Sequence, residues 1–255
     1  MRRVLLRPWS GREGKGSMMD EMKALDLLHT KAFLHSGCSD APAPTLLVLG
    51  GRSPSSSWLW ELSQVLKGKV WALDRGADVC KAAGLTPHRL LGDLDSISQN
   101  AYDWAKAAGA LVDRYPPDKN LTDFQLALQL LESPIVVTGC WGGRFDHLFS
   151  LLFSVLKAAD WGVRTLALID EREALFPLHG PSSLTLEFST LPESLSLLPL
   201  TRNCEGVSAE GVRWPLEDVT LEQKWPWAVS NIPRSSARFK VAKGVLGVYA
   251  AFEEC

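Results

Sequence analysis

The sequence lacks a Gly-x-x-x-x-Gly-Lys-Ser/Thr phosphate loop, a Gly-x-Gly-x-x-Gly dinucleotide fingerprint and a Gly-x-Ser-x-Gly nucleophile elbow. These absences argue against a Walker-type kinase, a dinucleotide-binding enzyme and an α/β hydrolase, because each motif builds the turn that its chemistry requires. An excess of one charge is missing too, since 27 basic residues stand against 29 acidic ones. General electrostatic binding to nucleic acid is therefore not expected, and an anionic ligand requires a local site.

Long apolar runs and closely spaced cysteines are also missing. No run approaches the roughly 20 apolar residues that cross a bilayer, and the N-terminus lacks the apolar stretch of a secretory signal. The five cysteines are scattered, without the pairs of a disulfide framework or a zinc site. These absences predict a soluble protein of the reducing cytoplasm that binds no membrane.

Residues 1–44 are predicted to be a poorly ordered extension and linker, because 1–15 is rich in Arg and Gly and 37–44 combines Gly, Ser, Pro and Ala. A native start at Met18, Met19 or Met22 explains this stretch as well as a functional tail does. Within it, residues 19–35 are compatible with one helix.

Residues 45–171 alternate short apolar runs with longer amphipathic ones, which predicts βα units around a doubly wound, mostly parallel sheet. Strands are predicted over 45–49, 69–73, 88–91, 110–112, 135–138 and 165–169, and helices over 57–66, 98–108, 122–131 and 146–159. Residues 172–255 change to Pro, Gly and Ser turns between β-forming runs, at 183–188, 194–198, 238–241 and 245–251. That spacing predicts an all-β sandwich domain.

Polar motifs follow five of the predicted strands, at 50–51, 74–76, 92–96, 118–123 and 139–147. In an open parallel sheet the loops at the carboxyl ends of the strands converge on one crevice, where ligands bind. Each motif alone is a common turn or helix cap. Their coincidence at one edge of the sheet predicts the functional site.

Asp93 and Asp95 form the sharpest of these motifs. Residues two apart in an extended segment point the same way, and two carboxylates roughly 4 Å apart repel by about 4 kcal/mol at an effective dielectric near 20. Such a pair favours a cation, and hard oxygen ligands suit magnesium shared with a nucleotide phosphate. The alternative, that Asp95 or Ser96 only caps the helix that begins near Ser98, leaves Asp93 unexplained.

Two further motifs open predicted helices. Asp118 and Asp123 add carboxylates around Thr122, which is itself a candidate N-cap. Arg144 stands at another predicted helix start, where a cation opposes the helix dipole, so it is expected to face a phosphate group.

Taken in order, residues 74–78 (DRGAD), 92–96 (GDLDS), 118–123 (DKNLTD) and 143–147 (GRFDH) resemble the motif series of thiamine pyrophosphokinases. Residues 211–216 (GVRWPL), Ser230-Asn231 and 244–246 (GVL) resemble that family's β-sandwich landmarks. The resemblance spans 46–252. It implies a homodimer that uses magnesium and ATP to convert thiamine to thiamine diphosphate, releasing AMP, with each site shared between the catalytic half of one subunit and the sandwich of the other.

The resemblance also implies residue roles by position. The implied magnesium ligands are Asp93, Asp95 and Asp123, with Asp118 as a weaker one. The implied ATP or phosphate contacts are Asp74, Gly76, Thr122, Arg144 and Asp146, and the implied thiamine contacts are Ser230 and Asn231. Catalysis is assigned to Asp93, Asp95, Asp123, Arg144 and Asp146, with Asp146 and Asp123 as alternative acceptors of the hydroxyl proton.

Four residues depart from the family pattern. Arg75 and Asp78 replace a Gly and an Asn, and Lys119 and Asn120 stand where Gln and Asp are usual. The last two changes make the acidic site more positive, which weakens metal binding or lets Lys119 contact a phosphate.

Two rival functions remain open at this point. One is pyrophosphorylation of another hydroxyalkyl heterocycle, such as a hydroxymethylpterin, and the other is thiamine or nucleotide binding without catalysis. A pocket for an aminopyrimidine at Trp214, Trp225 or Trp227 would favour thiamine, although Trp214 is expected to be sandwich core.

Overall fold

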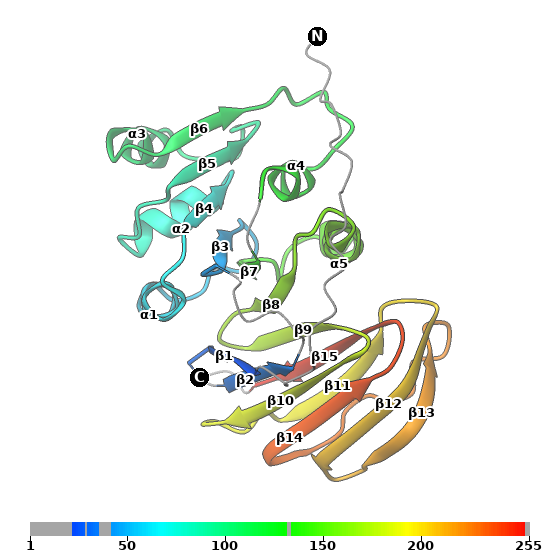
Figure 1. The fold of residues 1–255 in the computed structure, drawn as a ribbon. Coiled ribbons are helices and arrows are strands. Elements are labelled where there is room, and N and C mark those ends of the chain that lie inside the picture. The colour runs from blue at the N-terminus through cyan, green and yellow to red at the C-terminus, as the bar shows by residue number, and fades with distance from the viewer. Residues whose placement is uncertain (1–21, 29, 36–41, 132–133, 253–255) are drawn as a thin grey trace.

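The computed structural model describes residues 22–28, 30–35, 42–131 and 134–252. Its central element is a nine-stranded sheet of order β11-β15-β9-β8-β7-β3-β4-β5-β6 (Figure 1). The parallel strands are β3 (Thr45–Val48), β4 (Val70–Leu73), β5 (Arg89–Gly92), β6 (Leu111–Arg114), β7 (Ile135–Thr138) and β8 (Thr165–Ile169). The prediction of a doubly wound, mostly parallel sheet is confirmed.

Helices cover both faces of the parallel strands, as Figure 1 shows. They are α1 (Ser56–Leu66), α2 (Gly76–Ala82) and α3 (Gln99–Ala107) on one face, and α4 (Asp123–Leu130) and α5 (Phe145–Ala159) on the other. Leu46 and Val48 of β3 belong to the core under α1–α3, whereas Leu47 belongs to the core under α4 and α5. Burial on both faces explains why these strands are continuous apolar runs.

The α2 helix was not predicted from the sequence. It has only seven residues, too few for a helical period, and it begins at a glycine. A Cβ on Gly76 would lie 2.0 Å from the carbonyl oxygen of Val48. Only glycine therefore lets this helix start against β3.

A second, six-stranded antiparallel sheet packs against the end of the first to form the sandwich. Its order is β1 (Met22–Asp26), β2 (Thr30–His35), β10 (Ser182–Phe188), β14 (Pro233–Val241), β12 (Asn203–Val212) and β13 (Leu216–Glu222). The facing strands are β9 (Glu173–His179), β11 (Ser194–Pro199) and β15 (Val245–Ala251), which extend the nine-stranded sheet with antiparallel pairs. One core cluster runs from Ala72 in the α/β half to Phe239 in the sandwich.

The helix expected over 19–35 is wrong. Met22–Asp26 and Thr30–His35 form an antiparallel hairpin, and the second strand pairs with β10. Ala32 and Leu34 are buried while Lys31 is exposed, which is the two-residue period of a strand rather than that of a helix. Residues 22–35 are therefore part of the sandwich and not of a poorly ordered extension; 1–21 and 36–41 lie outside the described residues.

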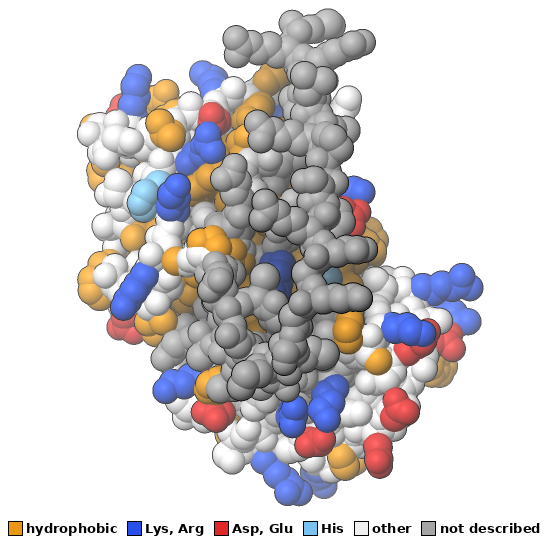
Figure 2. Space-filling model, in the orientation of Figure 1, with side chains coloured by type: hydrophobic (Ala, Val, Ile, Leu, Met, Phe, Trp, Pro, Cys, Tyr) orange, Lys and Arg blue, Asp and Glu red, His pale blue; other side chains and the backbone are white. Residues whose placement is uncertain are grey.

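Acidic and basic side chains are interspersed over the sandwich on the face shown in Figure 2. None of the helices in the described ranges is long and apolar enough to span a bilayer.

Candidate active site

Three carboxylates meet at the carboxyl edge of the parallel sheet. Asp74 follows β4, Asp93 follows β5, and Asp123 is the first residue of α4. One carboxylate oxygen from each lies within 4.8 Å of the other two. The sequence predicted a polar crevice at this edge, and the structure brings together Asp93 and Asp123 from the expected metal ligands with Asp74 from the expected ATP contacts.

Asp74 is held in place by its backbone and by its neighbours. Its φ of 45° lies in the left-handed region, which is rare outside glycine, and its Oδ1 accepts a hydrogen bond of 3.1 Å from the backbone N–H of Leu94. A Cβ on Gly92 would lie 1.8 Å from the same oxygen. Burial, with added repulsion from Asp123, raises the pKa of Asp74 to about 7.

Lys119 places its ammonium group inside this cluster. Its Nζ lies 3.0 Å from Asp123 Oδ1 and 3.5 Å from Asp93 Oδ2, and its side chain is 13% exposed. Burial opposes the charge on Lys119, but the two carboxylates outweigh it and raise the pKa of the ammonium group. This cation offsets part of the repulsion among the three carboxylates.

The donor set of the cluster suits a divalent cation. Two of the carboxylates lie on the loops after β4 and β5 and the third lies at the start of α4. All three supply hard oxygens, which are the ligands that magnesium prefers. Asp95 is exposed and its backbone N–H donates to Asp93 Oδ1 at 3.3 Å. Asp118 is exposed as well, so Asp95 and Asp118 stand outside the group of three.

Thr122 and the Arg144–Asp146 pair sit at helix starts. The Thr122 hydroxyl accepts from the N–H of Gln125 at 3.2 Å in a capping box, so its side chain is engaged by α4. The Arg144 guanidinium donates to Asp146 through Nε at 3.0 Å and Nη2 at 2.5 Å, and this pair is exposed. The bond from Arg144 lowers the pKa of Asp146.

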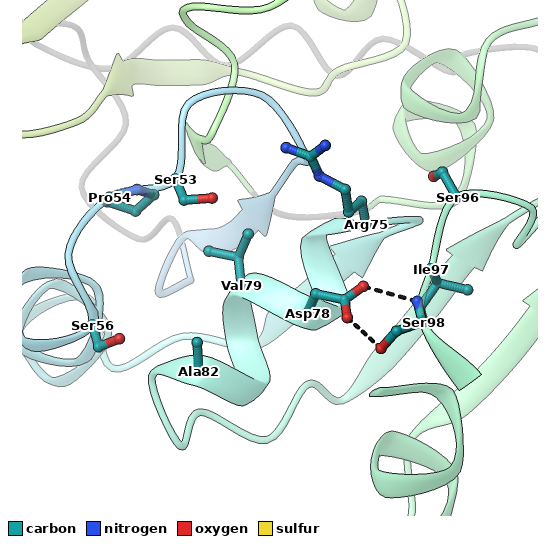
Figure 3. A pocket seen from close by; sticks show the side chains of 10 residues that line it. All are labelled: Ser53, Pro54, Ser56, Arg75, Asp78, Val79, Ala82, Ser96, Ile97 and Ser98. Atoms are coloured by element: carbon teal, nitrogen blue, oxygen red, sulfur yellow. Dashed lines mark hydrogen bonds between the residues drawn. The ribbon is translucent and has the colours of Figure 1, made fainter. Parts of the chain in front are cut away.

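A pocket of about 520 Å³ is lined in part by residues that directly follow two of the acidic positions, Arg75 after Asp74 and Ser96 after Asp95 (Figure 3). Its walls come from the loop after β3, from α2 and from the loop before α3, and it is lined by Ser53, Pro54, Ser56, Arg75, Asp78, Val79, Ala82, Ser96, Ile97 and Ser98. The carboxylate of Asp78 accepts hydrogen bonds from the backbone N–H and from the hydroxyl group of Ser98. Arg75 is exposed, stands one residue after Asp74 and lines this pocket.

The sandwich carries a second, mostly apolar cavity of about 240 Å³, lined in part by Trp214, Trp227 and Asn231. Asn231 is fixed by bonds in both directions with Trp214, whose N–H donates to Oδ1 at 3.1 Å and whose carbonyl accepts from Nδ2 at 2.7 Å. Ser230 has a φ of 58° in the same turn. Trp214 is 53% exposed and lines this cavity, so the expectation that it is sandwich core is wrong.

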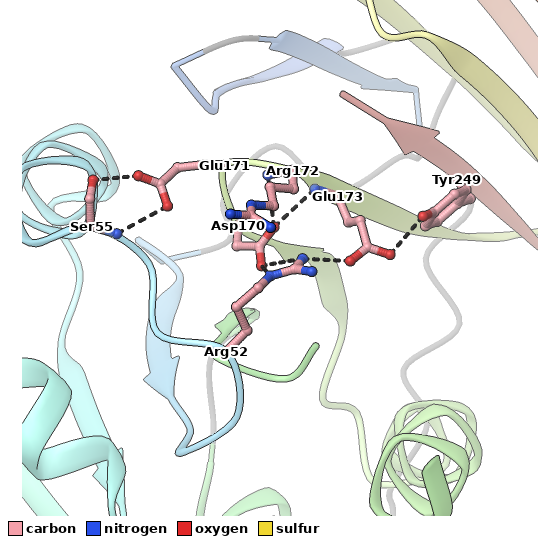
Figure 4. A network of polar contacts seen from close by, with 7 residues as sticks. All are labelled: Arg52, Ser55, Asp170, Glu171, Arg172, Glu173 and Tyr249. Carbon is pink, nitrogen blue, oxygen red and sulfur yellow. Dashed lines mark hydrogen bonds and ion pairs between the residues drawn. The ribbon is translucent and has the colours of Figure 1, made fainter. Parts of the chain in front are cut away.

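Sequence reasoning missed a polar network around Arg52 (Figure 4). The guanidinium of Arg52 donates hydrogen bonds to the carboxylates of Asp170 and Glu173. The Glu173 carboxylate also accepts a hydrogen bond of 2.7 Å from the hydroxyl group of Tyr249 on β15. The backbone N–H of Arg52 donates to the carbonyl of Trp141 at 2.6 Å. An acidic residue directly after the buried strand β8 was the available sequence signal for this network.

Comparisons with known proteins show which family this chain resembles. Residues 61–166 match the family described as thiamin pyrophosphokinase, catalytic domain, and residues 183–246 match thiamin pyrophosphokinase, vitamin B1 binding domain. A thiamine pyrophosphokinase of Bacillus subtilis (strain 168) is 26% identical over 183 residues, which are 69% of this chain and 85% of that protein. Thiamin pyrophosphokinase 1 of Caenorhabditis elegans is 28% identical over 146 residues, 53% of this chain and 58% of that protein.

Solved structures share the fold. The crystal structure of thiamine pyrophosphokinase from Bacillus subtilis has a TM-score of 0.70 at 23% identity, covering 83% of this chain and 100% of that one. The Candida albicans thiamin pyrophosphokinase has a TM-score of 0.65 at 16% identity, covering 82% and 90%.

Proposed function

This chain belongs to the thiamin pyrophosphokinase family, and we propose on that premise that it transfers the pyrophosphoryl group of ATP to the hydroxyethyl group of thiamine, giving thiamine diphosphate and AMP. The observation that carries the proposal is the cluster of Asp74, Asp93 and Asp123 within the matched catalytic domain. The match of residues 183–246 to a vitamin B1 binding domain lends no support to the pterin alternative.

Magnesium, when bound, supplies charge neutralisation for the phosphates of ATP and for the charge that develops during transfer. Asp93 and Asp123 would hold it, with Asp74 as the third carboxylate and Asp95 at the exposed side. The 520 Å³ pocket would take the nucleoside part of ATP, since its lining combines apolar side chains with serine hydroxyl groups and Arg75. The chain then contributes mainly positioning and a fixed electrostatic field.

The exposed Arg144–Asp146 pair is proposed to meet the phosphates when substrates bind. Asp146 has a lowered pKa and is a weak base while Arg144 is bonded to it. If Arg144 turns to a phosphate, Asp146 is released to accept the proton of the thiamine hydroxyl. Asp123 remains the alternative acceptor.

A homodimer is proposed as the working form, with thiamine held by the sandwich of one subunit over the catalytic edge of the other. Two apolar surfaces support it. Phe145, Phe149 and Phe153 are 77%, 53% and 44% exposed along one face of α5, with successive ring centroids 6.0 and 4.7 Å apart. The sandwich exposes a second surface around Trp225 and Trp227. Exposed apolar patches of this kind commonly mark interfaces between proteins.

The cytoplasm is the proposed compartment. Cys80, Cys140 and Cys204 are free and buried, which suits a reducing environment.

The direct test is incubation of the purified protein with ATP, magnesium and thiamine, followed by separation of nucleotides and thiamine esters. Formation of AMP and thiamine diphosphate in equal amounts is expected. Formation of ADP in place of AMP, or of AMP without thiamine diphosphate, would reject the proposal.

A further inference from the structure

Lys119 occupies an unusual position for a basic residue, because it lies where a metal ion would neutralise the acidic cluster. Its Nζ makes ion pairs with both Asp93 and Asp123, at 3.5 and 3.0 Å, and only 13% of its side chain is exposed. The third carboxylate, Asp74, has an oxygen within 4.8 Å of the same two groups. One largely buried cation therefore pairs directly with two of the three carboxylates.

An ammonium group at this place competes with a magnesium ion for the same oxygens. A free magnesium ion that enters the cluster meets the positive charge of Lys119 only a few ångströms away, in a partly buried site where charges are weakly screened. Its binding therefore requires Lys119 to move. The long flexible side chain of lysine allows such movement, provided that another anion accepts the ammonium group.

We propose that Lys119 acts as an internal counterion that offsets part of the negative charge of the empty cluster, and that it turns to a phosphate oxygen of the nucleotide when magnesium enters with that nucleotide. The inference rests on the proposed function, because ATP supplies the phosphate. Magnesium in such sites is shared between carboxylates and phosphates, so a phosphate oxygen lies close to the position that Lys119 leaves. Asn120, the next residue, is uncharged and offers no competing ion pair.

A coupling between two ligands follows from this arrangement. Free magnesium binds weakly because it must displace Lys119, and the nucleotide relieves that conflict by receiving the displaced ammonium group. Magnesium and nucleotide each increase the affinity for the other, by the same factor in both directions. Lys119 is then a phosphate-binding residue and also a determinant of metal affinity.

The test compares Lys119→Met with the wild type in two calorimetric titrations. The first uses magnesium chloride alone on nucleotide-free protein, and the second uses the magnesium complex of α,β-methylene-ATP, whose bridging carbon blocks transfer. We expect Lys119→Met to bind free magnesium about tenfold more tightly and the nucleotide complex about tenfold more weakly, since removal of one charge acts with opposite sign on the two ligands. Lys157→Met, which removes an exposed lysine on α5, should change neither affinity.

Opposite changes in the two titrations distinguish this role from a structural one. If Lys119→Met leaves the free-magnesium affinity unchanged, or weakens both affinities together, the inference is wrong. Lys119→Gln provides a second uncharged side chain if the methionine variant fails to fold, and Lys119→Arg should keep free-magnesium binding weak. Absence of AMP from the wild-type assay would instead count against the proposed function while the magnesium titration still decides the role of Lys119.

Discussion

Arg52 and Asp170 are 118 residues apart in the chain and form a close ion pair, with Nε and Nη2 of the arginine 2.8 and 2.6 Å from Asp170 Oδ2. Asp170 is 2% exposed and also accepts bonds of 2.9 Å from the backbone N–H groups of Arg172 and Glu173. The pair connects the loop after β3, at the catalytic edge, with the turn that leads from β8 into the sandwich. Because Tyr249 on β15 bonds Glu173, both halves share one polar network.

Asp170→Ala is expected to lower the free energy of unfolding by about 3 kcal/mol, because it leaves a partly buried guanidinium with one partner fewer. Urea denaturation followed by tryptophan fluorescence measures the change. Glu205→Ala is the control, since its ion pair with Lys243 is exposed and should contribute within about 1 kcal/mol. Equal losses for the two variants would contradict a special role for the Arg52 network.

Asp93→Asn is expected to reduce turnover by about 10²- to 10³-fold with little change in melting temperature, because it removes a charge aimed at the reacting phosphates. Asp95→Asn should fold normally, lose less turnover and require more magnesium, since Asp95 lies outside the group of three. Steady-state kinetics over a series of magnesium concentrations measure both effects. Asp160→Asn, at the far end of α5, serves as the control; full activity of Asp93→Asn would remove the basis of the metal site.

The raised pKa of Asp74 predicts a pH dependence of stability in protein freed of metal by EDTA. The folded state favours the protonated carboxyl, so the unfolded state loses its proton first as the pH rises above about 4. The free energy of unfolding should therefore decrease between about pH 4 and pH 7. Urea denaturation at a series of pH values should show this decrease in the wild type and a smaller one in Asp74→Asn. A parallel decrease in both proteins would show that Asp74 is not its source.

Deletion of residues 1–38 is expected to reduce the yield of folded protein, because it removes the hairpin that pairs with β10. Leu184 and Leu186 on β10 are fully buried and lie beside that hairpin. Deletion of residues 1–20 leaves both strands in place and should preserve the melting temperature. Comparison of soluble expression and thermal unfolding for the two truncations tests the assignment, and equal behaviour would show that the hairpin is dispensable.

Phe149→Glu is expected to convert the proposed homodimer to monomers, because it places a charge in the exposed row of phenylalanines on α5. Sedimentation velocity at assay concentration measures the change. Trp60→Glu replaces another exposed aromatic, on α1, and should leave the dimer intact. A wild-type protein that is monomeric and fully active would exclude the shared site.

Local sequence patterns were enough to predict the α/β order and the edge of the sheet at which the polar motifs lie. Ile135–Thr138 and Thr165–Ile169 were predicted with the bounds that the structure has, because strands buried on both faces are continuous apolar runs with clear ends. Asp93 was expected at the carboxyl edge because the motif at 92–96 follows a predicted strand, and it was singled out by its two-residue spacing from Asp95. The start of α4 followed from the capping side chain of Thr122, which acts within one turn of the backbone, whereas the cap of α3 is Ser98 and not Asp95.

Which of the edge residues meet could not be predicted from local patterns, because it depends on how separate segments pack. Asp74, Asp93 and Asp123 come from three separate segments, and their approach depends on loop conformations such as the positive φ of Asp74. The place of Lys119 between two of them, and the pairing of Arg52 with Asp170, depend in the same way on long-range packing. The hairpin before β3 was missed because an isolated pair of short strands has little stability, so it forms only where β10 offers it an edge. Local sequence patterns predict individual helices and strands, because the spacing of apolar residues shows which face of each element is buried. Contacts between distant segments depend on the strand order and register of the sheet, which local patterns do not specify.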